Sequence, residues 1–180
     1  DLHPNELPMW LAHPWASYCE DSHPRVRLHW LCDTAELVVR WTVAVALAEV
    51  VHAHDGVIPN DVARAILEHV ERPTLGRWLA ILRALCKASP KQLIATQDLN
   101  RWVSSTLEPA FQTEQHGGTI TSSLLVLRNQ VAHGGGMTRA KAETLVAQHE
   151  PTLIDLLEGV KATIAGSRVV ADGLALMGLS

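Results

Sequence analysis

The sequence is poor in tyrosine and phenylalanine, with one of each, although it contains six tryptophans. Its large aromatic side chains are therefore almost all indoles, which usually serve as anchors in a core or an interface. Charged residues are also few, at 19% against 47% hydrophobic residues, and this balance favours a folded domain over a disordered chain. At 180 residues the chain has room for one ordinary domain with a hydrophobic core.

Cysteine is scarce, and its spacing excludes two common uses. Cys19, Cys32 and Cys86 form an odd and widely separated set without a Cys-x-x-Cys pair. This pattern argues against a disulfide framework and against a zinc ribbon, and it predicts a reducing, cytoplasmic environment. The ten histidines are scattered rather than arranged at one metal-ligand spacing, so we expect no metal and no cofactor.

Long apolar runs are missing as well. The longest, Leu37 to Val51, contains Arg40 and Glu49 and falls short of the roughly 20 residues that span a membrane. We therefore expect a buried helix here and no membrane partner. The chain begins at Asp1 rather than Met, without a basic leader before an apolar segment, which we interpret as a piece cut from a longer protein whose other domains are its partners.

A strong positive charge is also absent, because the net charge at pH 7 is −4. Proteins that hold nucleic acid through a uniformly basic surface release many counterions on binding, and this composition excludes that class. Any contact with RNA or DNA must therefore be local.

A series of helical segments is present, separated by proline, glycine and capping residues. The longest begins after Ser22 at Pro24, and Asp55-Gly56 ends it. The second half of this central helix is apolar nearly all round, as in a helix that enters a bundle. The expected helices cover residues 7–18, 25–52, 61–71, 75–88, 99–107, 120–132 and 138–164.

Caps and prolines set the expected boundaries of these helices. Residues with suitable N-cap side chains precede three of them, namely Asn60, Thr74 and Thr119, and Thr138 opens the last one. We expect Pro109 to stop the helix before it, and Pro151 to bend or break the last helix.

The end of the chain changes character. Arg168 to Ala171, the turn pair Asp172-Gly173 and Leu174 to Met177 form a hairpin pattern. An isolated hairpin is marginal in water, so residues 167–180 are interpreted as the start of a following domain or a hairpin tail. The expected fold is all-α, with a helical bundle over residues 1–166 and a short β-hairpin-like C-terminal tail.

The expected helix from residue 120 to 132 has two different faces. Its core stripe contains four apolar residues, Ile120, Leu124, Leu127 and Val131. The opposite side mixes apolar, small and polar groups, namely Ser122, Leu125, Asn129, Ala132 and His133. Such a mixture suits a partner surface better than a fully solvated face.

Three polar residues near the end of this helix form the chain's most specific group. Asn129 and His133 are one turn apart on the same face, whereas Arg128 and His133 are about 140° apart around the axis. The triple glycine at 134–136 is expected to end the helix and leave His133 at an open end. The ordinary alternative is that His133 complements the helix dipole while Arg128 and Asn129 coat a surface.

The string Leu-Leu-Val-Leu-Arg-Asn-Gln-Val-Ala-His-Gly, residues 124 to 134, resembles the HEPN superfamily. The mark of that family is Arg, often followed by a polar residue such as Asn, and then His after a short spacing late in a helical bundle. Glu36 in the long helix, residues 75–78 and Arg83 also look like elements of bacterial HEPN-like domains of multidomain proteins. The resemblance covers roughly residues 5 to 165 and is strongest at 124 to 134.

The resemblance implies a homodimer that cleaves RNA without a metal, by attack of the ribose 2′-hydroxyl on the adjacent phosphate. It assigns the catalytic roles to Arg128 and His133, with Asn129 as their polar neighbour. The residue types fit, because His moves protons near neutral pH and Arg neutralises phosphate oxygens. A bacterial antiviral defence, toxin or stress system is the expected setting. The alternative is a non-catalytic HEPN-like module that dimerises or docks a partner.

Two further groups have alternative interpretations. Glu36 and Arg40, one turn apart in an apolar stretch, either form a buried ion pair or position groups around Arg128. His52 and His54 next to Asp55 are interpreted as a helix C-terminal cap rather than metal ligands.

Overall fold

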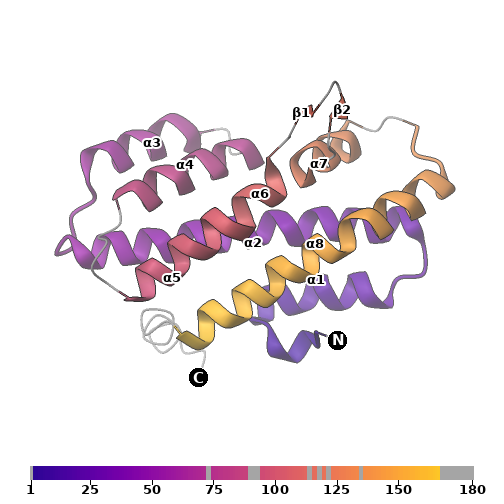
Figure 1. The fold of residues 1–180 in the computed structure, drawn as a ribbon, viewed down its shortest axis with the longest axis horizontal. Coiled ribbons are helices and arrows are strands. Elements are labelled where there is room, and N and C mark those ends of the chain that lie inside the picture. Colours follow the sequence, from indigo (N-terminus) through magenta and orange to yellow (C-terminus); the bar gives the residue numbers. More distant parts are fainter. Residues whose placement is uncertain are drawn as a thin grey trace. The chain divides into compact units, whose positions relative to one another are not determined.

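The computed structural model describes residues 2–71, 74–88, 94–112, 115–116, 119–120, 123–133 and 136–166. Within these residues every regular element is a helix except for one short hairpin, so the predicted mostly helical fold is confirmed (Figure 1). The chain divides into two compact units, residues 1–38 with 106–161, and residues 39–105 with 162–180. The predicted hairpin tail at 167–180 lies outside the described residues.

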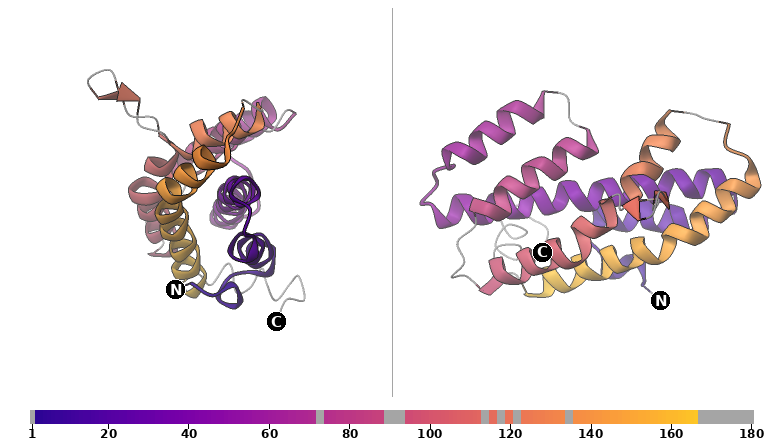
Figure 2. Two further views of the ribbon diagram at one scale, coloured as in Figure 1. Left: turned by 90° about the vertical axis from the view of Figure 1, so that its right-hand side faces the viewer. Right: turned by 45° about the horizontal axis from the view of Figure 1, so that its top comes forward.

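The first unit is built mainly from three long helical segments. It contains η1 (Pro4–Glu6), α1 (Met9–Glu20), the first half of α2 (Pro24–Ala53), α6 (Glu108–Phe111), the strands β1 (Gln115–His116) and β2 (Thr119–Ile120), α7 (Leu124–Ala132) and most of α8 (Arg139–Gly166). The two strands pair antiparallel. Figures 1 and 2 show α1 and α8 beside the N-terminal part of α2.

One cluster ties α1, α2 and α8 together within this unit. The rings of Trp15 and Tyr18 stack with their centroids 5.1 Å apart, and the Trp15 indole Nε1 donates to the Leu2 carbonyl at 3.1 Å. The Arg27 guanidinium lies 4.5 Å from the centre of the Tyr18 ring and is 3.2 Å from the Glu150 carboxylate. A cation held between an aromatic face and a carboxylate thus joins three helices.

The second unit contains the second half of α2 and the helices that follow it. These are α3 (Asn60–Val70), α4 (Leu75–Ala88), α5 (Ile94–Trp102) and the first residues of the π-helix η2 (Val103–Leu107). In Figure 1, α3 lies alongside α4. In α4, Leu79, Leu82 and Leu85 are buried, while Trp78 is half-buried. The Arg40 guanidinium carbon lies 5.8 Å from the centre of the Trp78 ring.

A C-terminal cap at Asp55-Gly56 ends α2, as the sequence indicates. The Gly56 amide donates to the Val51 carbonyl at 2.8 Å, which is the long bond of a Schellman motif. Asp55 occupies the left-handed position at φ 52°, and Gly56 follows with φ 85°. The described part of the chain contains no group of three or more His, Cys, Asp or Glu side chains that could hold a metal ion.

Several predicted helix boundaries are confirmed. The predicted helices at 25–52 and 75–88 correspond to α2 and α4. Thr74 caps α4 through a 3.4 Å bond from the Arg77 amide, and Thr138 caps α8 through a 3.2 Å bond from the Lys141 amide. Hydroxyl groups satisfy amides that lack partners in the first turn of a helix.

Two proline predictions need correction. Pro109 does not stop the helix before it, because η2 leads directly into α6, in whose first turn Pro109 lies. A first-turn residue needs no amide hydrogen, so proline is tolerated there. Of the two outcomes expected at Pro151, the break is wrong, because α8 runs without interruption from Arg139 to Gly166, and the bend stays a prediction. Proline has no amide hydrogen, so the Ala147 carbonyl receives no helical hydrogen bond from residue 151. Ala147 is exposed, and water can donate to its carbonyl instead.

Two cap predictions are wrong. Thr119 does not begin a helix, because it lies with Ile120 in β2, and α7 begins only at Leu124. Ser123 is the cap, and its hydroxyl accepts from the Val126 amide at 3.3 Å. Serine is at least as good a cap as threonine, and it stands directly before the apolar run. Similarly, Asn60 is the first residue of α3 rather than its cap, which is Pro59.

Acid should destabilise the protein through His149, which lies in α8 and is only 4% exposed. Burial lowers the pKa of this imidazole below its ordinary value of 6.5. The imidazole of His149 therefore takes up a proton more readily in the unfolded chain than in the folded protein. The stability that the neutral, buried imidazole contributes is present above the unfolded pKa and is lost as the pH falls below it. We expect His149→Leu to reduce the fall in unfolding free energy between about pH 7.5 and about pH 5.5 in denaturant titrations.

The exposed His23 is the matched control for this measurement. The pH dependence should fall more in His149→Leu than in His23→Leu, because only His149 is buried. An equal slope in wild type and His149→Leu would show that His149 does not contribute to it.

Candidate functional site

The short helix α7 presents its two faces as the sequence indicates. Leu124 and Leu127 are buried, and Val131 is half-buried. On the opposite side, Asn129, Ala132 and His133 are exposed and Leu125 is half-buried. Of the other two residues predicted for these faces, Ile120 belongs to β2, and Ser122 lies outside the described residues.

Arg128 is anchored to the long helix α2. Its Nε donates to Glu36 Oε2 at 3.2 Å, and the Glu36 side chain is 13% exposed. Arg40 is exposed, so Glu36 and Arg40 do not form a fully buried pair. The Glu36 carboxylate positions Arg128, which was the other interpretation of Glu36.

The anchored guanidinium keeps part of its surface open. The Arg128 side chain is 32% exposed, and its two terminal nitrogens make no hydrogen bond with any residue that the structure describes. A guanidinium carries five donors in a planar fork, of which Glu36 uses the one on Nε. The remaining edge is therefore free to bind an anion such as a phosphate oxygen.

His133 is the C-cap of α7, with φ −87° and ψ 3°. Its backbone amide donates to the Asn129 carbonyl at 3.1 Å, while its imidazole is exposed. Within the described part of the chain, no hydrogen bond joins the side chains of Arg128, Asn129 and His133. A single copy thus places the three residues on one helix end without bringing Arg128 and His133 into contact.

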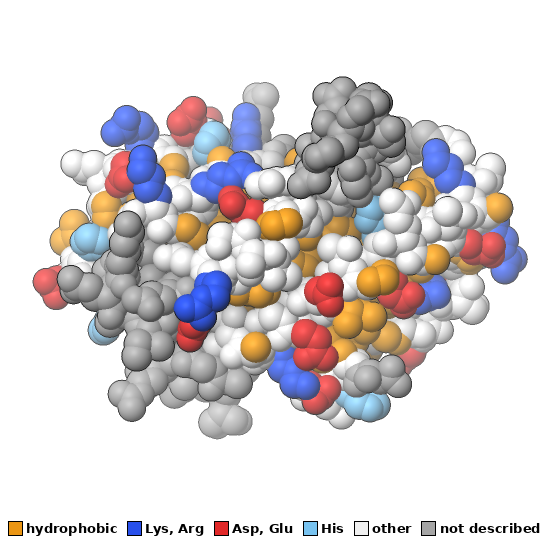
Figure 3. All heavy atoms as spheres, viewed as in Figure 1, with side chains coloured by type: hydrophobic (Ala, Val, Ile, Leu, Met, Phe, Trp, Pro, Cys, Tyr) orange, Lys and Arg blue, Asp and Glu red, His pale blue; other side chains and the backbone are white. Residues whose placement is uncertain are grey.

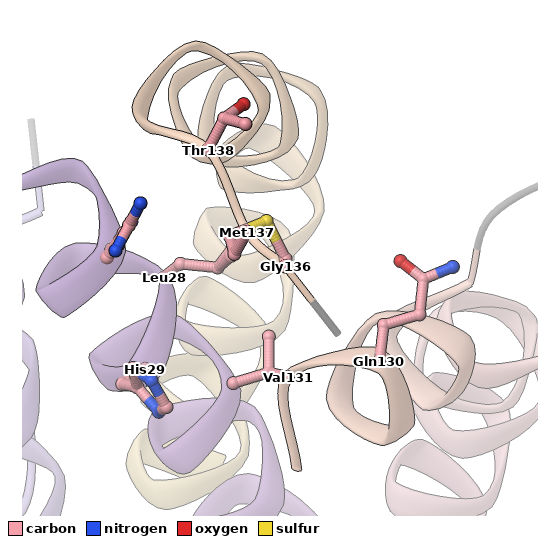
Figure 4. Close-up of a pocket in the computed structure, with 8 residues that line it drawn as sticks. Leu28, His29, Gln130, Val131, Gly136, Met137 and Thr138 are labelled. Atoms are coloured by element: carbon pink, nitrogen blue, oxygen red, sulfur yellow. The ribbon is translucent and has the colours of Figure 1, made fainter. Parts of the chain in front are cut away.

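A pocket of about 490 Å³ lies beside this helix end, and the sequence analysis did not identify it. Its lining comes from α2, from α7 and from the segment before α8 (Figure 4), namely Arg25, Leu28, His29, Gln130, Val131, Gly136, Met137 and Thr138. No sequence signal marks this pocket, because residues more than a hundred positions apart form it.

Two of the three cysteines, Cys19 and Cys32, have little nucleophilic character in this fold. Burial raises the pKa of the Cys32 thiol to about 12, with a smaller contribution from the Asp33 carboxylate. Burial also raises the pKa of Cys19. Since the thiolate is the reactive form, neither residue is set up to attack a substrate.

The surface charges of both signs are mixed on the face shown in Figure 3. Lys and Arg side chains alternate there with Asp and Glu rather than forming one positive field. This agrees with the expectation that any contact with nucleic acid is local. None of the described helices is both long and apolar enough to cross a membrane.

Comparisons with protein-family models, with curated proteins and with solved structures gave no match. The resemblance to the HEPN superfamily therefore remains a prediction carried mainly by residues 124 to 134.

The anchor between Glu36 and Arg128 should be measurable in the stability of the protein. We expect Glu36→Gln to lower the free energy of unfolding by about 1–2 kcal/mol, because it leaves a half-buried guanidinium without its carboxylate. Glu143→Gln is the matched control, since Glu143 pairs with Arg139 at 3.0 Å but both side chains are more than half exposed. That change should cost less than about 0.5 kcal/mol. Equal losses in urea titrations would contradict a structural role for the anchor.

Proposed function

We propose that this chain is a metal-independent endoribonuclease domain in which Arg128 and His133 cleave RNA, with Asn129 orienting the substrate. The observation that carries this proposal is the pairing of Arg128 with Glu36, which fixes the guanidinium and leaves its terminal nitrogens open five residues before an exposed His133. The sequence resemblance at 124 to 134 supports the same assignment. A bacterial defence, toxin or stress system is the setting that we propose for this activity.

The chemistry needs a base, an acid and a group that stabilises negative charge. The ribose 2′-oxygen forms a bond to the adjacent phosphorus as its proton is removed, and the 5′-oxygen of the next nucleotide leaves and takes up a proton. An imidazole serves as the base and an imidazolium as the acid. The open edge of Arg128 stabilises the charge that develops on the phosphate oxygens.

A dimer supplies two copies of His133, one as the base and one as the acid. It also brings together an arginine and a histidine that point in different directions on a single helix. Arg128 and His133 diverge by about 140° on α7, so one copy does not aim both at the same phosphate. Two α7 helices facing each other across a two-fold axis bring the Arg of one copy to the His of the other. The face with Leu125, Asn129 and Ala132 is available for this contact because Asn129 and Ala132 are exposed and Leu125 is half-buried.

The product ends test the proposed mechanism. In the presence of EDTA, single-stranded RNA should yield fragments with 2′,3′-cyclic phosphate and 5′-hydroxyl ends, because the 2′-oxygen is the nucleophile. DNA and 2′-O-methyl RNA should remain intact. His133→Ala should reduce the rate at least about 100-fold, since it removes the proton-transfer group. Arg128→Lys should also slow cleavage, because an ammonium lacks the planar fork.

His52→Ala is a matched control, because His52 is also exposed but lies in the last turn of α2 and does not line the pocket. It should retain the cleavage rate of the wild type at saturating RNA. Full activity of His133→Ala would remove the site assignment, and magnesium-dependent cutting of DNA would overturn the mechanism.

The proposed dimer has its own test. Leu125→Glu should convert dimers into folded monomers, because it places two carboxylates against each other in a desolvated seam. Sedimentation velocity measures the association, and far-UV circular dichroism measures the fold. An undisturbed dimer would exclude this surface, whereas an unfolded chain would show that Leu125 packs within its own copy. Leu67→Glu on α3 is the control, because Leu67 is 72% exposed on another helix.

The mixed surface charge favours one alternative, a non-catalytic module that dimerises or docks a partner. The chain has a net charge of −4, and the described residues on the face shown in Figure 3 form no extended positive track for RNA. Such a module would dimerise through the same face of α7 but would leave RNA uncut. Cleavage by wild type that is absent from His133→Ala separates the two functions.

A further inference from the structure

Exposed apolar side chains gather on and just before the helix α3. Six large hydrophobic residues are exposed in the described part of the chain, and four of them lie between residues 57 and 70, namely Val57, Ile58, Leu67 and Val70. Within α3 itself, Leu67 is 72% exposed and Val70 is 44% exposed. Single exposed apolar residues are normal on a protein surface, whereas a group of them on one element indicates a contact surface.

The apolar part of α3 extends beyond its core-facing side. On that side Val62 is buried and Ile66 is half-buried, and α3 packs against α4, which lies beside it in Figure 1. At about 100° per residue, Ala63, Leu67 and Val70 form a second strip about 90° further round the helix axis. We refer to these three residues as the outer strip. Leu67 and Val70 thus form an apolar surface next to the packed side of α3.

Two residues of opposite charge border the outer strip. Arg64 and Glu71 lie within about 20° of each other around the axis of α3, and both are exposed. Neither side chain forms an ion pair or a hydrogen bond with any residue in the described ranges. Side chains on one helix pair at a spacing of three or four residues, so a spacing of seven does not allow these two to pair with each other. The flank of the outer strip therefore offers one positive and one negative group to a partner.

A second copy of α3 matches both the strip and its charged flank. In a parallel pair of helices, a two-fold axis along the helices would place each charge opposite the same charge. An axis perpendicular to α3 and beside Leu67 reverses the second helix, so Arg64 of each copy lies opposite Glu71 of the other. Leu67 then meets its own symmetry copy, and the aliphatic stem of Arg64 covers Val70 of the other copy. The pattern is therefore self-complementary only in the antiparallel arrangement.

We propose that the outer strip of α3 binds the outer strip of a second copy in an antiparallel two-fold contact. The contact is small, because α3 has 11 residues and is only about 16 Å long, whereas a standard interface buries about 800 Å² on each partner. Its dissociation constant is accordingly above about 10 µM. The contact is separate from the face of α7 that the proposed endoribonuclease uses. It joins single copies if the α7 dimer does not form, and it joins dimers into larger assemblies if that dimer forms.

The contact is tested by mixing two charge-reversed variants. Arg64→Glu and Glu71→Arg each place like charges opposite each other at both ends of the contact, so each variant alone should associate at least about tenfold more weakly than wild type. An equimolar mixture should recover the affinity of wild type to within about threefold, because the carboxylate introduced in one variant faces the guanidinium introduced in the other. Sedimentation velocity of the full chain between about 5 and about 500 µM measures the association.

The apolar part of the contact has its own variant and controls. Leu67→Glu should prevent the association alone and in every mixture, because it places two carboxylates in the centre of the strip. Met9→Glu on α1 is the matched control, since Met9 is 76% exposed on another helix. Arg139→Glu on α8 is the control for the charge reversal. Both controls should associate as wild type does, and circular dichroism checks that each variant is folded.

The concentration separates this contact from the α7 dimer. At a few micromolar the α3 contact is not populated, so Leu67→Glu remains a neutral control for the α7 dimer there. A mass that rises with concentration in wild type but not in Leu67→Glu supports the α3 contact, whether the associating unit is one copy or an α7 dimer.

Two results would overturn the proposal. Equal masses for wild type and Leu67→Glu at about 500 µM would show that no second copy binds the strip, which would leave it to a different protein or domain. A mixture of Arg64→Glu and Glu71→Arg that associates no better than either variant alone would exclude the antiparallel arrangement. RNA cleavage is measured at low micromolar concentration, so failure of the endoribonuclease proposal is detected independently of either result.

Discussion

The ion pair between Glu36 and Arg128 is the constraint on which the candidate site depends. It joins α2 to α7 across 92 positions of sequence. It also fixes the direction of the Arg128 guanidinium, which comes from the middle of α7. Without this carboxylate, a partly buried arginine on a nine-residue helix would lose its main polar contact. The pair therefore serves both stability and placement, since the same bond that holds α7 also sets which edge of Arg128 remains open.

Three arginines of the first unit have different surroundings. Arg27 is enclosed between the Tyr18 ring and Glu150, and it joins three helices. Arg128 has one anchored edge and one open edge, which suits it to contact a phosphate. Arg25, which pairs with no described residue, contributes its whole guanidinium to the pocket lining. Donors left open on Arg25 and Arg128 thus distinguish these residues from Arg27, whose guanidinium is enclosed.

The end of α7 is the point where the proposed cleavage site and the pocket lined by α2, α7 and the segment before α8 come together along the chain. Gln130 and Val131 line the pocket, and His133 caps the helix only two residues later. The proposed proton-transfer group and part of the pocket lining therefore share one short helix, whose orientation depends on its anchor to α2.

The sequence by itself determined the helical class, the extents of α2 and α4, and the two faces of α7, because local periodicity specifies these features. Capping chemistry likewise placed the cap at Thr74 and the start of the last helix at Thr138. It misplaced the start of α7, since the pairing of β1 with β2 takes Thr119 and Ile120 out of the helix. Only the tertiary structure decided that Glu36 contacts Arg128 and that α2, α7 and the segment before α8 enclose a pocket. These contacts join residues 92 or more positions apart, and no local pattern encodes a pairing over that distance.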